Sequence, residues 1–394
     1  MPLVHSIRPN GHLARAAIRL SSLRCSPGAY ISPRGRYSSS YAHLNAELTS
    51  RRLPLIFDYL SPQNSHLLDV SLADYLPQGS SRPSHYLPPA SEANLLPFGH
   101  HLIYFPPPKT GSQLLPDGTD PDQSPGEPFV RRMWAGGHVR YNPDQALQVR
   151  LDGKPHVCVE GIRDVSVKGK EGDEKVFVGI ERRVGRIEED ELAQLNSAHR
   201  SSSSADAAIQ AAEDAIRARV WTAEPDEFGA AGIVERRNIV FMRERSPTDA
   251  AADAAKKPGK MLKPQRAPDF EHTVAPNDKL LFRYSALTFN AHAIHLDPAY
   301  CRNVEGHRNL LVHGPLSFTF MTTLLRLQLA KEGGQALVLR EVEYRNLAPL
   351  YAGEPLRLCG RLVEEREGER RYEVWAETPE GGIAVKGTAR VGSK

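Results

Sequence analysis

Residues 281–319 read LFRYSALTFNAHAIHLDPAYCRNVEGHRNLLVHGPLSFT. With Leu280 before it, the apolar start of this stretch predicts a strand or a buried segment that leads into a site. Three polar residues, Asn290, His292 and His295, then follow within six residues. Imidazole and amide side chains gathered beside an apolar segment indicate a candidate catalytic site.

The end of this stretch has the features of a helix start. Gly314 lets the backbone come close to a neighbour, and Pro315 has the fixed φ that suits the first helical position. The largely apolar run that follows extends to Leu329 and predicts a buried helix. Its residues at helical spacing include Leu316, Phe320, Leu324 and Leu327. A helix N-terminus that points free N–H groups at the polar cluster would stabilise a developing negative charge.

The pattern resembles the MaoC-like, or hydratase 2, family of the hot-dog fold. That family has an aromatic residue, a small Ser or Thr, then Gly-Asp-x-Asn-Pro-aliphatic-His, and a His-Gly pair downstream. The corresponding residues here are Tyr284, Thr288, Phe289, Asn290, Ala291, His292, Ala293, Ile294, His295, His313 and Gly314. Asn290 stands in place of the family's acidic residue, His292 in place of its Asn and Ala293 in place of its Pro.

Val304–Gly306 and His313–Leu316 extend the match. The whole pattern is most similar to the fungal mitochondrial 3-hydroxyacyl-thioester dehydratases and the related mesaconyl-CoA hydratase-like proteins. The resemblance implies an α+β fold, a double hot-dog in which two antiparallel sheets each wrap around a central helix. It also implies that the two sheets join into one, as in the homodimers of single-domain members.

The composition is that of an ordinary folded chain. At 394 residues the chain has room for about two domains, and 40% hydrophobic and 25% charged residues are usual values. No apolar run approaches the roughly 20 residues of a membrane-spanning helix, so no membrane insertion is expected. The four cysteines have no C-x-x-C spacing, which predicts free thiols in a reducing compartment.

The N-terminus is predicted to be a mitochondrial transit peptide covering residues 1–46. This segment carries six arginines and no acidic residue, and Arg36-Tyr37-Ser38 resembles a matrix-protease site. The alternative is a disordered basic tail. Without these arginines the net charge of +3 becomes about −3, so no nucleic-acid surface is indicated. The expected location is the mitochondrial matrix.

Residues 47–245 are predicted to form an N-terminal MaoC-like hot-dog domain. Runs around Phe105, 117–120, 129–137 and 237–244 resemble the N-terminal MaoC dehydratase domain. This unit has no counterpart of the Asn290–His295 cluster, so we expect it to be non-catalytic. The elements expected in it are a short helix from Leu67, strands at 101–105, 129–141, 156–168, 175–186 and 233–243, and within an insertion at 190–219 a helix at 205–219 capped by Ser204.

A linker is predicted at 246–267, because its residues are small, charged and interrupted by proline. Residues 268–394 are predicted to be the catalytic C-terminal hot-dog domain. After the buried helix, strands are expected at 336–346, 355–366, 370–378 and 382–391, the last three joined by short turns.

The catalytic residues are predicted to be His295, Asn290 and Gly314. His295 is the candidate base, since imidazole titrates near neutral pH, and Gly314 offers a backbone N–H to the thioester oxygen. An amide transfers no proton near neutral pH, so Asn290 is expected to orient water or a hydroxyl group. Tyr284, Thr288, His292, His313 and Ser317 are predicted to bind substrate or line the site. His292 is also an alternative base.

The resemblance implies an (R)-3-hydroxyacyl-thioester dehydratase or enoyl-thioester hydratase of mitochondrial fatty acid synthesis. Its substrate would be carried by acyl carrier protein or CoA, with no cofactor and no metal. A short-chain CoA hydratase of the mesaconyl-CoA type, a hot-dog thioesterase and a non-catalytic acyl-binding protein stay open as alternatives. A homodimer of the two-domain chain is a further open point.

Overall fold

The computed structural model describes residues 41–77, 80, 83–200, 205–256, 259, 261–332, 337–366 and 368–393. Its centre is one ten-stranded sheet with the order β1-β3-β4-β5-β2-β7-β10-β9-β8-β6. All printed pairings in it are antiparallel. The strands are β1 (Ile56–Tyr59), β2 (Arg131–Tyr141), β3 (Pro155–Lys168), β4 (Lys175–Arg186), β5 (Ile233–Met242), β6 (Phe270–Val274), β7 (Leu337–Asn346), β8 (Leu356–Arg366), β9 (Glu369–Glu377) and β10 (Ile383–Ser393).

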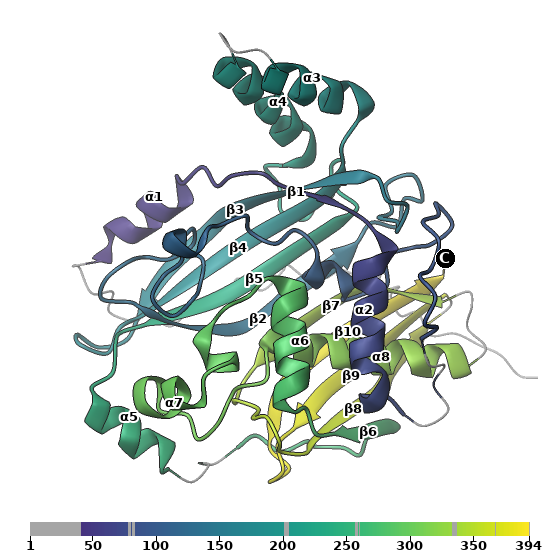
Figure 1. Cartoon of the computed structure of the whole chain (residues 1–394). Helices are drawn as coiled ribbons and strands as arrows, with labels where there is room; N and C mark the ends of the chain where they lie inside the picture. The colour runs from purple at the N-terminus through teal and green to yellow at the C-terminus, as the bar shows by residue number, and fades with distance from the viewer. Residues whose placement is uncertain are drawn as a thin grey trace, which may run out of the picture. The chain divides into compact units, whose positions relative to one another are not determined.

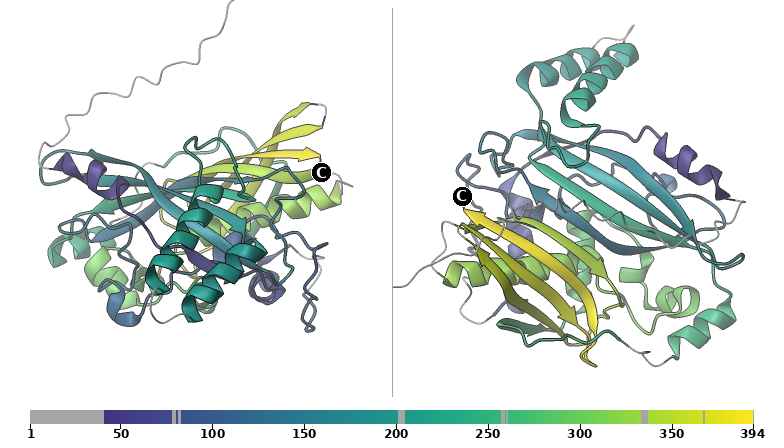
Figure 2. Two further views of the ribbon diagram at one scale, coloured as in Figure 1. Left: turned by 90° about the horizontal axis from the view of Figure 1, so that it is seen from above. Right: turned by 180° about the vertical axis from the view of Figure 1, so that it is seen from behind.

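Helices gather on one face of this sheet, while the view from behind exposes the strands (Figures 1 and 2). The α-helices are α1 (His43–Thr49), α2 (Pro62–Leu72), α3 (Glu189–Arg200), α4 (Ala205–Val220), α5 (Pro247–Ala254), α6 (Asp278–Thr288), α7 (Pro298–Tyr300) and α8 (Gly314–Lys331). Shorter 3₁₀ turns include His100–Ile103 and Ala293–His295, and a π-turn spans Cys301–Glu305. Within the described part of the chain, no helix is long and apolar enough to span a membrane.

The helix predicted after Gly314 is confirmed as α8, which lies against strands of the C-terminal half. Eleven of its residues are buried, and Phe318, Phe320 and Leu325 have no exposed surface. In the N-terminal half, the shorter α2 packs against α6, and both lie on the same face of the sheet as α8 (Figure 1). One large core includes residues of both halves, so neither half buries its apolar surface alone.

The two halves join edge to edge through β2 and β7, as predicted. Gly136 opposes Arg345 at this junction, and a Cβ on Gly136 would lie 2.2 Å from the Tyr344 carbonyl oxygen. Only glycine therefore fits this close approach. Trp134 adds two hydrogen bonds across the junction: its Nε1 donates to Tyr344 Oη (2.9 Å), and its carbonyl accepts from Asn346 Nδ2 (2.8 Å).

The prediction of a strand at the start of the motif is wrong, because the residues there, Leu280 and Leu281, belong to α6. Asn277 caps this helix through a hydrogen bond from the Leu280 N–H to its side chain (3.0 Å). Leu280, Leu281 and Tyr284 are buried on one side, which is helical rather than strand spacing. The segment is buried as predicted, but its backbone hydrogen bonds are local.

The strand predicted at 101–105 is also wrong. Residues His100–Ile103 form a buried 3₁₀ turn after Gly99, whose φ of 90° reverses the chain. All four residues of the turn are buried, so the side chains do not alternate between a core and a solvent face. The Phe105 N–H is bound by the Asp58 carboxylate (2.9 Å) instead of by a neighbouring strand.

Three segments contain more structure than the sequence indicated. The insertion is a pair of packed helices, α3 and α4, of which only α4 was predicted; Ser204, its predicted cap, lies outside the described residues. The linker at 246–267 contains α5, where the Ser246 side chain accepts from the Asp249 N–H (3.1 Å) and Ala250 is buried. The short edge strand β6 was not predicted either.

Folded structure is already present within residues 41–46, which the predicted boundary assigned to the leader. Leu44 on α1 is buried, and the Asn45 side chain accepts from the Val165 N–H of β3 (3.1 Å). The rest of the predicted transit peptide, residues 1–40, lies outside the described part of the chain. Cys158, Cys301 and Cys359 are free and buried.

Candidate active site

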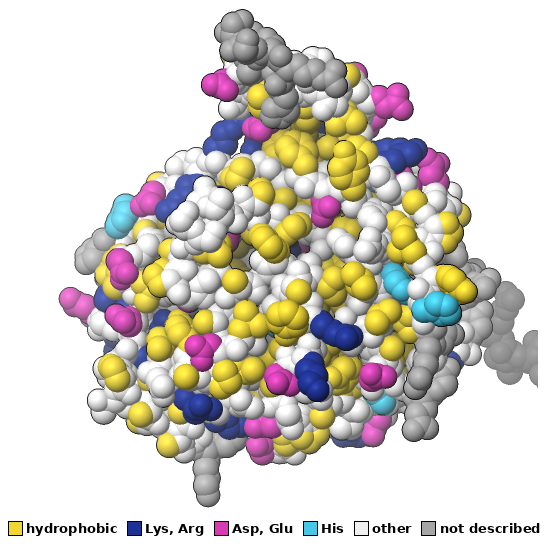
Figure 3. Space-filling model, viewed as in Figure 1, with side chains coloured by type: hydrophobic (Ala, Val, Ile, Leu, Met, Phe, Trp, Pro, Cys, Tyr) yellow, Lys and Arg dark blue, Asp and Glu magenta, His cyan; other side chains and the backbone are white. Residues whose placement is uncertain are grey.

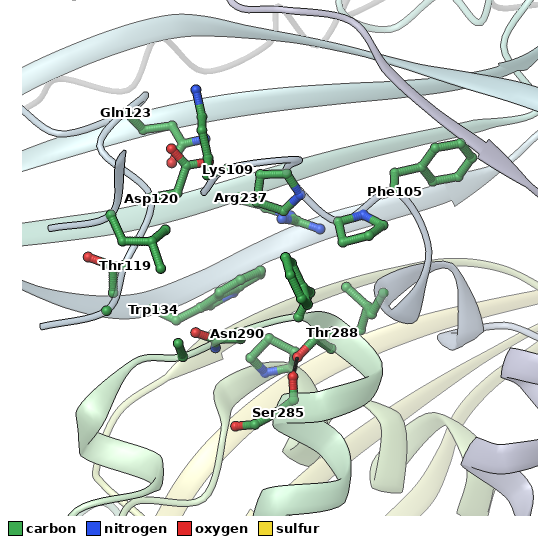
Figure 4. A pocket seen from close by; sticks show the side chains of 18 of the residues that line it. Phe105, Lys109, Thr119, Asp120, Gln123, Trp134, Arg237, Ser285, Thr288 and Asn290 are labelled. Carbon is green, nitrogen blue, oxygen red and sulfur yellow. Dashed lines mark hydrogen bonds between the residues drawn. The ribbon is translucent and has the colours of Figure 1, made fainter. Parts of the chain in front are cut away.

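Two cavities meet between the N-terminal strands and the segment from α6 to α8. The larger has a volume of about 510 Å³ and the smaller about 270 Å³. Arg132, Trp134, Ile239, Asn290 and Pro315 line both, so these residues mark the place where the cavities join. Figure 4 shows the larger cavity, with Ser285 and Thr288 approaching from α6 and Trp134 and Arg237 from the strands above.

The mouth of the larger cavity is apolar. Phe282 and Phe289 are each 64% exposed and line it, as does Leu296. On the same face of the molecule, apolar side chains are frequent over the middle, where α2 and α6 lie (Figure 3). Deeper in, the cavity carries charges that are already paired, such as Glu160 with Arg182 (3.0 Å).

His295 has the protonation state that a general base needs. Its Nδ1 lies 2.8 Å from the Leu311 carbonyl oxygen, which can only accept, so Nδ1 carries the proton and Nε2 has a free lone pair. Burial lowers the pKa of His295 to about 4, against a smaller opposing effect of the Leu311 hydrogen bond. The ring is therefore neutral at pH 7, and it lines the smaller cavity.

His313 supports His295 from one side. The two rings stack with centroids 3.6 Å apart and planes at 20°. His313 occupies the N-cap position of α8, is 1% exposed, and its Nε2 lies 2.9 Å from Ser285 Oγ. This arrangement favours a supporting role for His313 over the predicted contact with substrate.

Asn290 is held at the end of α6 by an unusual backbone turn. Phe289 closes the helix with a φ of 51°, a left-handed conformation that is strained for a bulky residue. The Asn290 N–H then donates to the Ser285 carbonyl (2.8 Å), and its Oδ1 accepts from the His292 N–H (3.0 Å). The amide Nδ2 is left as the group that can donate to a ligand.

The N-terminus of α8 forms part of the smaller cavity through Gly314, Pro315 and Ser317. A Cβ on Gly314 would lie 2.8 Å from Asn346 Nδ2 and 3.2 Å from Trp134 Cβ, so the backbone is tightly enclosed here. The Ser317 hydroxyl donates to the His313 carbonyl (3.2 Å) and so braces the first turn. The Gly314 N–H belongs to that first turn, whose amides have no partner within the helix.

The remaining predicted site residues form walls of the larger cavity. Tyr284 is 1% exposed, and its hydroxyl lies 3.5 Å from Thr319 Oγ1. The Thr288 hydroxyl is bound to the Tyr284 carbonyl (2.8 Å). Both polar groups are thus turned toward the protein. The structure brings Asn290, His292, His295, Gly314 and Ser317 together around the smaller cavity.

Sequence reasoning missed the contribution of the N-terminal half. Arg132 and Trp134 line both cavities where they join. The Arg132 guanidinium lies over the Phe241 ring (5.0 Å) and donates to the Asp120 carbonyl (2.9 Å). Arg132 and Trp134 fall in a run that resembles the N-terminal dehydratase domain, but nothing local indicated which side chains would turn toward the C-terminal half. No group of three or more His, Cys, Asp or Glu that could hold a metal occurs in the described ranges.

A pH dependence of stability follows from the buried histidines. Burial lowers the pKa of His100, His101, His156, His292, His295, His307 and His313. The unfolded chain binds protons at these positions below pH about 6.5, whereas the folded protein does not, so stability falls as the pH drops. We expect the free energy of unfolding to fall by about 1 kcal/mol between pH 7 and 5.5 for each histidine that stays neutral.

Urea unfolding at the two pH values measures this loss. His156→Gln is the control, because His156 lies outside the site. Between pH 7 and 5.5 this variant should lose about 1 kcal/mol less of its free energy of unfolding than wild type, since one buried histidine is gone. A free energy of unfolding that is unchanged between pH 7 and 5.5 would show that the folded protein binds as many protons as the unfolded chain, and would contradict this prediction.

Several known proteins are similar to this chain. The sequence model of the family described as hydroxyacyl-thioester dehydratase type 2 matches residues 99–218 and 185–352. The chain is 27% identical over 307 residues to mesaconyl-C(4)-CoA hydratase of Chloroflexus aurantiacus, covering 77% of this chain and 86% of the relative. It is 26% identical over 309 residues to the mitochondrial hydroxyacyl-thioester dehydratase type 2 of Schizosaccharomyces pombe, covering 77% and 88%.

A solved structure supports the fold. A MaoC-like dehydratase from Phytophthora capsici matches with a TM-score of 0.53 at 13% identity, covering 89% of this chain and 97% of that one. At this identity the match confirms the α+β hot-dog architecture and carries no information on substrate.

Proposed function

The chain belongs to the hydroxyacyl-thioester dehydratase type 2 family and is a hydro-lyase of the hydratase/dehydratase type, and from this premise we propose a finer activity. We propose that it interconverts (R)-3-hydroxyacyl and enoyl thioesters in mitochondrial fatty acid synthesis. The observation that carries this proposal is the neutral His295, with its free Nε2 in the same cavity as the first turn of α8.

In the dehydration direction, Nε2 of His295 removes a proton from C2 of the substrate. The electron pair of that C–H bond moves into the thioester, and the N–H of Gly314 donates to the resulting enolate oxygen. The pair then forms the C2=C3 double bond as the C3–O bond breaks. His295 returns its proton to the departing oxygen, which leaves as water, while the Asn290 amide orients that oxygen. Hydration is the reverse.

The two joined cavities suit a thioester substrate, which has two arms. One arm is the acyl chain, and the other is the phosphopantetheine group shared by CoA and acyl carrier protein. The cavities meet at Asn290, Trp134 and Pro315, so a thioester carbonyl placed near Gly314 leaves room for an arm on either side. One relative is named as a hydratase of a CoA thioester and another as a dehydratase of hydroxyacyl thioesters, and both names support this class of substrate.

The test is a panel assay with crotonyl, long-chain enoyl and mesaconyl thioesters, each offered on CoA and on acyl carrier protein. Loss of the enoyl thioester absorbance with retention of the thioester supports the proposal. Preference for mesaconyl-CoA would instead assign a short-chain CoA hydratase. Release of free thiol would indicate a thioesterase, and binding without turnover an acyl-binding protein.

Asn290 provides a prediction about the missing acidic residue. Asn290→Ala is expected to lower kcat by about 10-fold, because the oxygen at C3 loses an orienting donor while His295 remains. Asn290→Asp should stay active with an altered pH profile, since it keeps the volume but adds a partly buried charge. Steady-state kinetics of crotonyl thioester hydration at several pH values measure both. A kcat of Asn290→Ala equal to that of wild type would remove Asn290 from the mechanism.

We further propose that the protein acts in the mitochondrial matrix. The acid-free, arginine-bearing N-terminus supports this, as does the Schizosaccharomyces pombe relative, which is named as mitochondrial. A reporter fused to residues 1–46 is expected to enter the matrix and be cut near Tyr37. Retention of the reporter in the cytosol would contradict this location. Size measurement by light scattering will decide whether the two-domain chain forms the homodimer left open above.

A further inference from the structure

A loop of the N-terminal half is seated on the catalytic motif. The Ala293 N–H donates to the Asp117 carbonyl (2.9 Å). Next to it, Gly118 has a φ of 82°, and a Cβ there would lie 2.2 Å from the Ala291 carbonyl oxygen. The loop and the motif therefore touch through their backbones, which fixes the position of the Asp117 side chain relative to His292.

The Asp117 carboxylate has one satisfied and one unsatisfied oxygen. Oδ1 accepts from the Thr119 N–H (3.0 Å) and from the Thr119 hydroxyl (2.5 Å). Oδ2 is buried without a hydrogen-bond partner and lies 3.4 Å from His292 Nε2, which is also buried without a partner. The two side chains are 7% and 6% exposed. A buried oxygen and a buried ring nitrogen without hydrogen-bond partners destabilise the fold unless they interact with each other.

The electrostatic surroundings keep the His292 ring neutral. Burial lowers the pKa of His292 well below its usual range, and the neighbouring His295 and Arg132 side chains oppose a second positive charge there. A neutral imidazole carries its proton on only one of its two nitrogens, so a neighbouring carboxylate decides which one. Oδ2 of Asp117 can only accept when ionised, and it faces Nε2.

We propose that Asp117 is a positioning residue that acts through His292. Its carboxylate holds the proton of His292 on Nε2, so that Nδ1 keeps a lone pair for the O–H of the water or of the 3-hydroxyl group in the smaller cavity. His295 remains the only group that transfers protons. The acidic residue that the motif lacks at position 290 is thus replaced by a carboxylate from the other half of the chain. This inference rests on the proposed hydratase function.

Asp117→Asn isolates the oxygen that matters. An amide can keep Oδ1 as the acceptor for Thr119 and so preserve the turn, while NH₂ replaces Oδ2. That NH₂ group favours an unprotonated Nε2 and so moves the His292 proton to Nδ1. Nδ1 can then no longer accept a hydrogen bond from the water or the 3-hydroxyl group. We expect kcat for crotonyl thioester hydration to fall 10- to 100-fold, with KM within about twofold and the melting temperature nearly unchanged.

Asp152→Asn is the matched control. The Asp152 side chain is 3% exposed, its Oδ1 accepts from the Lys154 N–H two residues on (3.0 Å), and its Oδ2 lies 3.8 Å from Arg186. Like Asp117, Asp152 thus accepts through Oδ1 from an N–H two residues on and has a nitrogen-bearing side chain near Oδ2, but it lies outside both cavities. Its kcat should equal that of wild type.

A double-mutant cycle separates positioning from structure. In a His292→Gln background, Asp117→Asn should cost less than twofold more, because the group through which it acts is gone. An additive loss in that background would show that Asp117 acts independently of His292, and would overturn the proposal.

Nitrogen NMR of the imidazole rings gives a readout that does not need activity. With His292 assigned by its absence in His292→Gln, wild type should show a protonated Nε2 and an unprotonated Nδ1, and Asp117→Asn the reverse. A wild-type ring protonated on Nδ1 overturns the proposal, whether or not the variant folds. If wild type hydrates none of the thioesters, the proposed function fails, while the spectrum still decides the Asp117–His292 pairing.

Discussion

His295→Ala is expected to lower kcat/KM for enoyl thioester hydration by 10²-fold or more, with little change in the overall fold. The reason is that the neutral His295 ring is bound through Nδ1 to the Leu311 carbonyl at 2.8 Å, which leaves a lone pair on Nε2 to accept the C2 proton in the proposed mechanism. Neither Asn290 nor the Gly314 N–H can accept and return a proton.

The same residue should set the pH dependence of activity. Since burial lowers the pKa of His295 to about 4, the base is present above that pH and is lost as the pH falls through it. The rate should be level from pH 6 to 8 and decline as the pH drops below about 5.

A matched control exists for the loss of a buried histidine. His156 is 3% exposed and its Nδ1 lies 3.1 Å from the Lys154 carbonyl, so it has similar burial and a similar hydrogen bond. His156→Ala should lower stability and leave kcat/KM unchanged. Activity that survives His295→Ala but is lost in His292→Ala would move the base to His292.

Gly314→Ala is expected to lower kcat by about 10- to 100-fold, the second largest effect. The added Cβ would lie 2.8 Å from Asn346 Nδ2 and 3.2 Å from Trp134 Cβ, so either the helix start or the β2–β7 junction must shift. A displaced N–H would no longer reach the enolate oxygen, and that interaction matters more in the transition state than in the bound substrate. The loss should therefore fall on kcat more than on KM.

Gly392→Ala controls for adding a methyl group at a glycine. Among the described residues, the side chain that its Cβ would meet is the flexible Arg340, at 3.4 Å, near the end of β10. This variant should retain the wild-type kcat. A Gly314→Ala enzyme with unchanged kcat would rule out the first turn of α8 as the donor to the thioester oxygen.

Much of the candidate site could be predicted from the sequence because its signals are local. Asn290, His292 and His295 lie within six residues, and Gly314-Pro315 marks the start of α8 through the backbone preferences of those two residues. The strands of the C-terminal half follow from alternating side chains and short turns. Where a local signal was ambiguous the prediction failed: Leu280 and Leu281 suit a buried strand or a buried helix, and the Asn277 cap decided for the helix.

The sequence by itself therefore determined the candidate catalytic motif, the buried helix behind it and the antiparallel sheet. Only the tertiary structure decided that Arg132 and Trp134 line the place where the two cavities join and that the Asp117 carboxylate faces His292. These residues lie more than 150 positions before Asn290 along the chain. Their place depends on the register of β2 against β7 and on the loop seated at Ala291–Ala293. Such contacts arise from the packing of one half on the other, which no local propensity or spacing encodes.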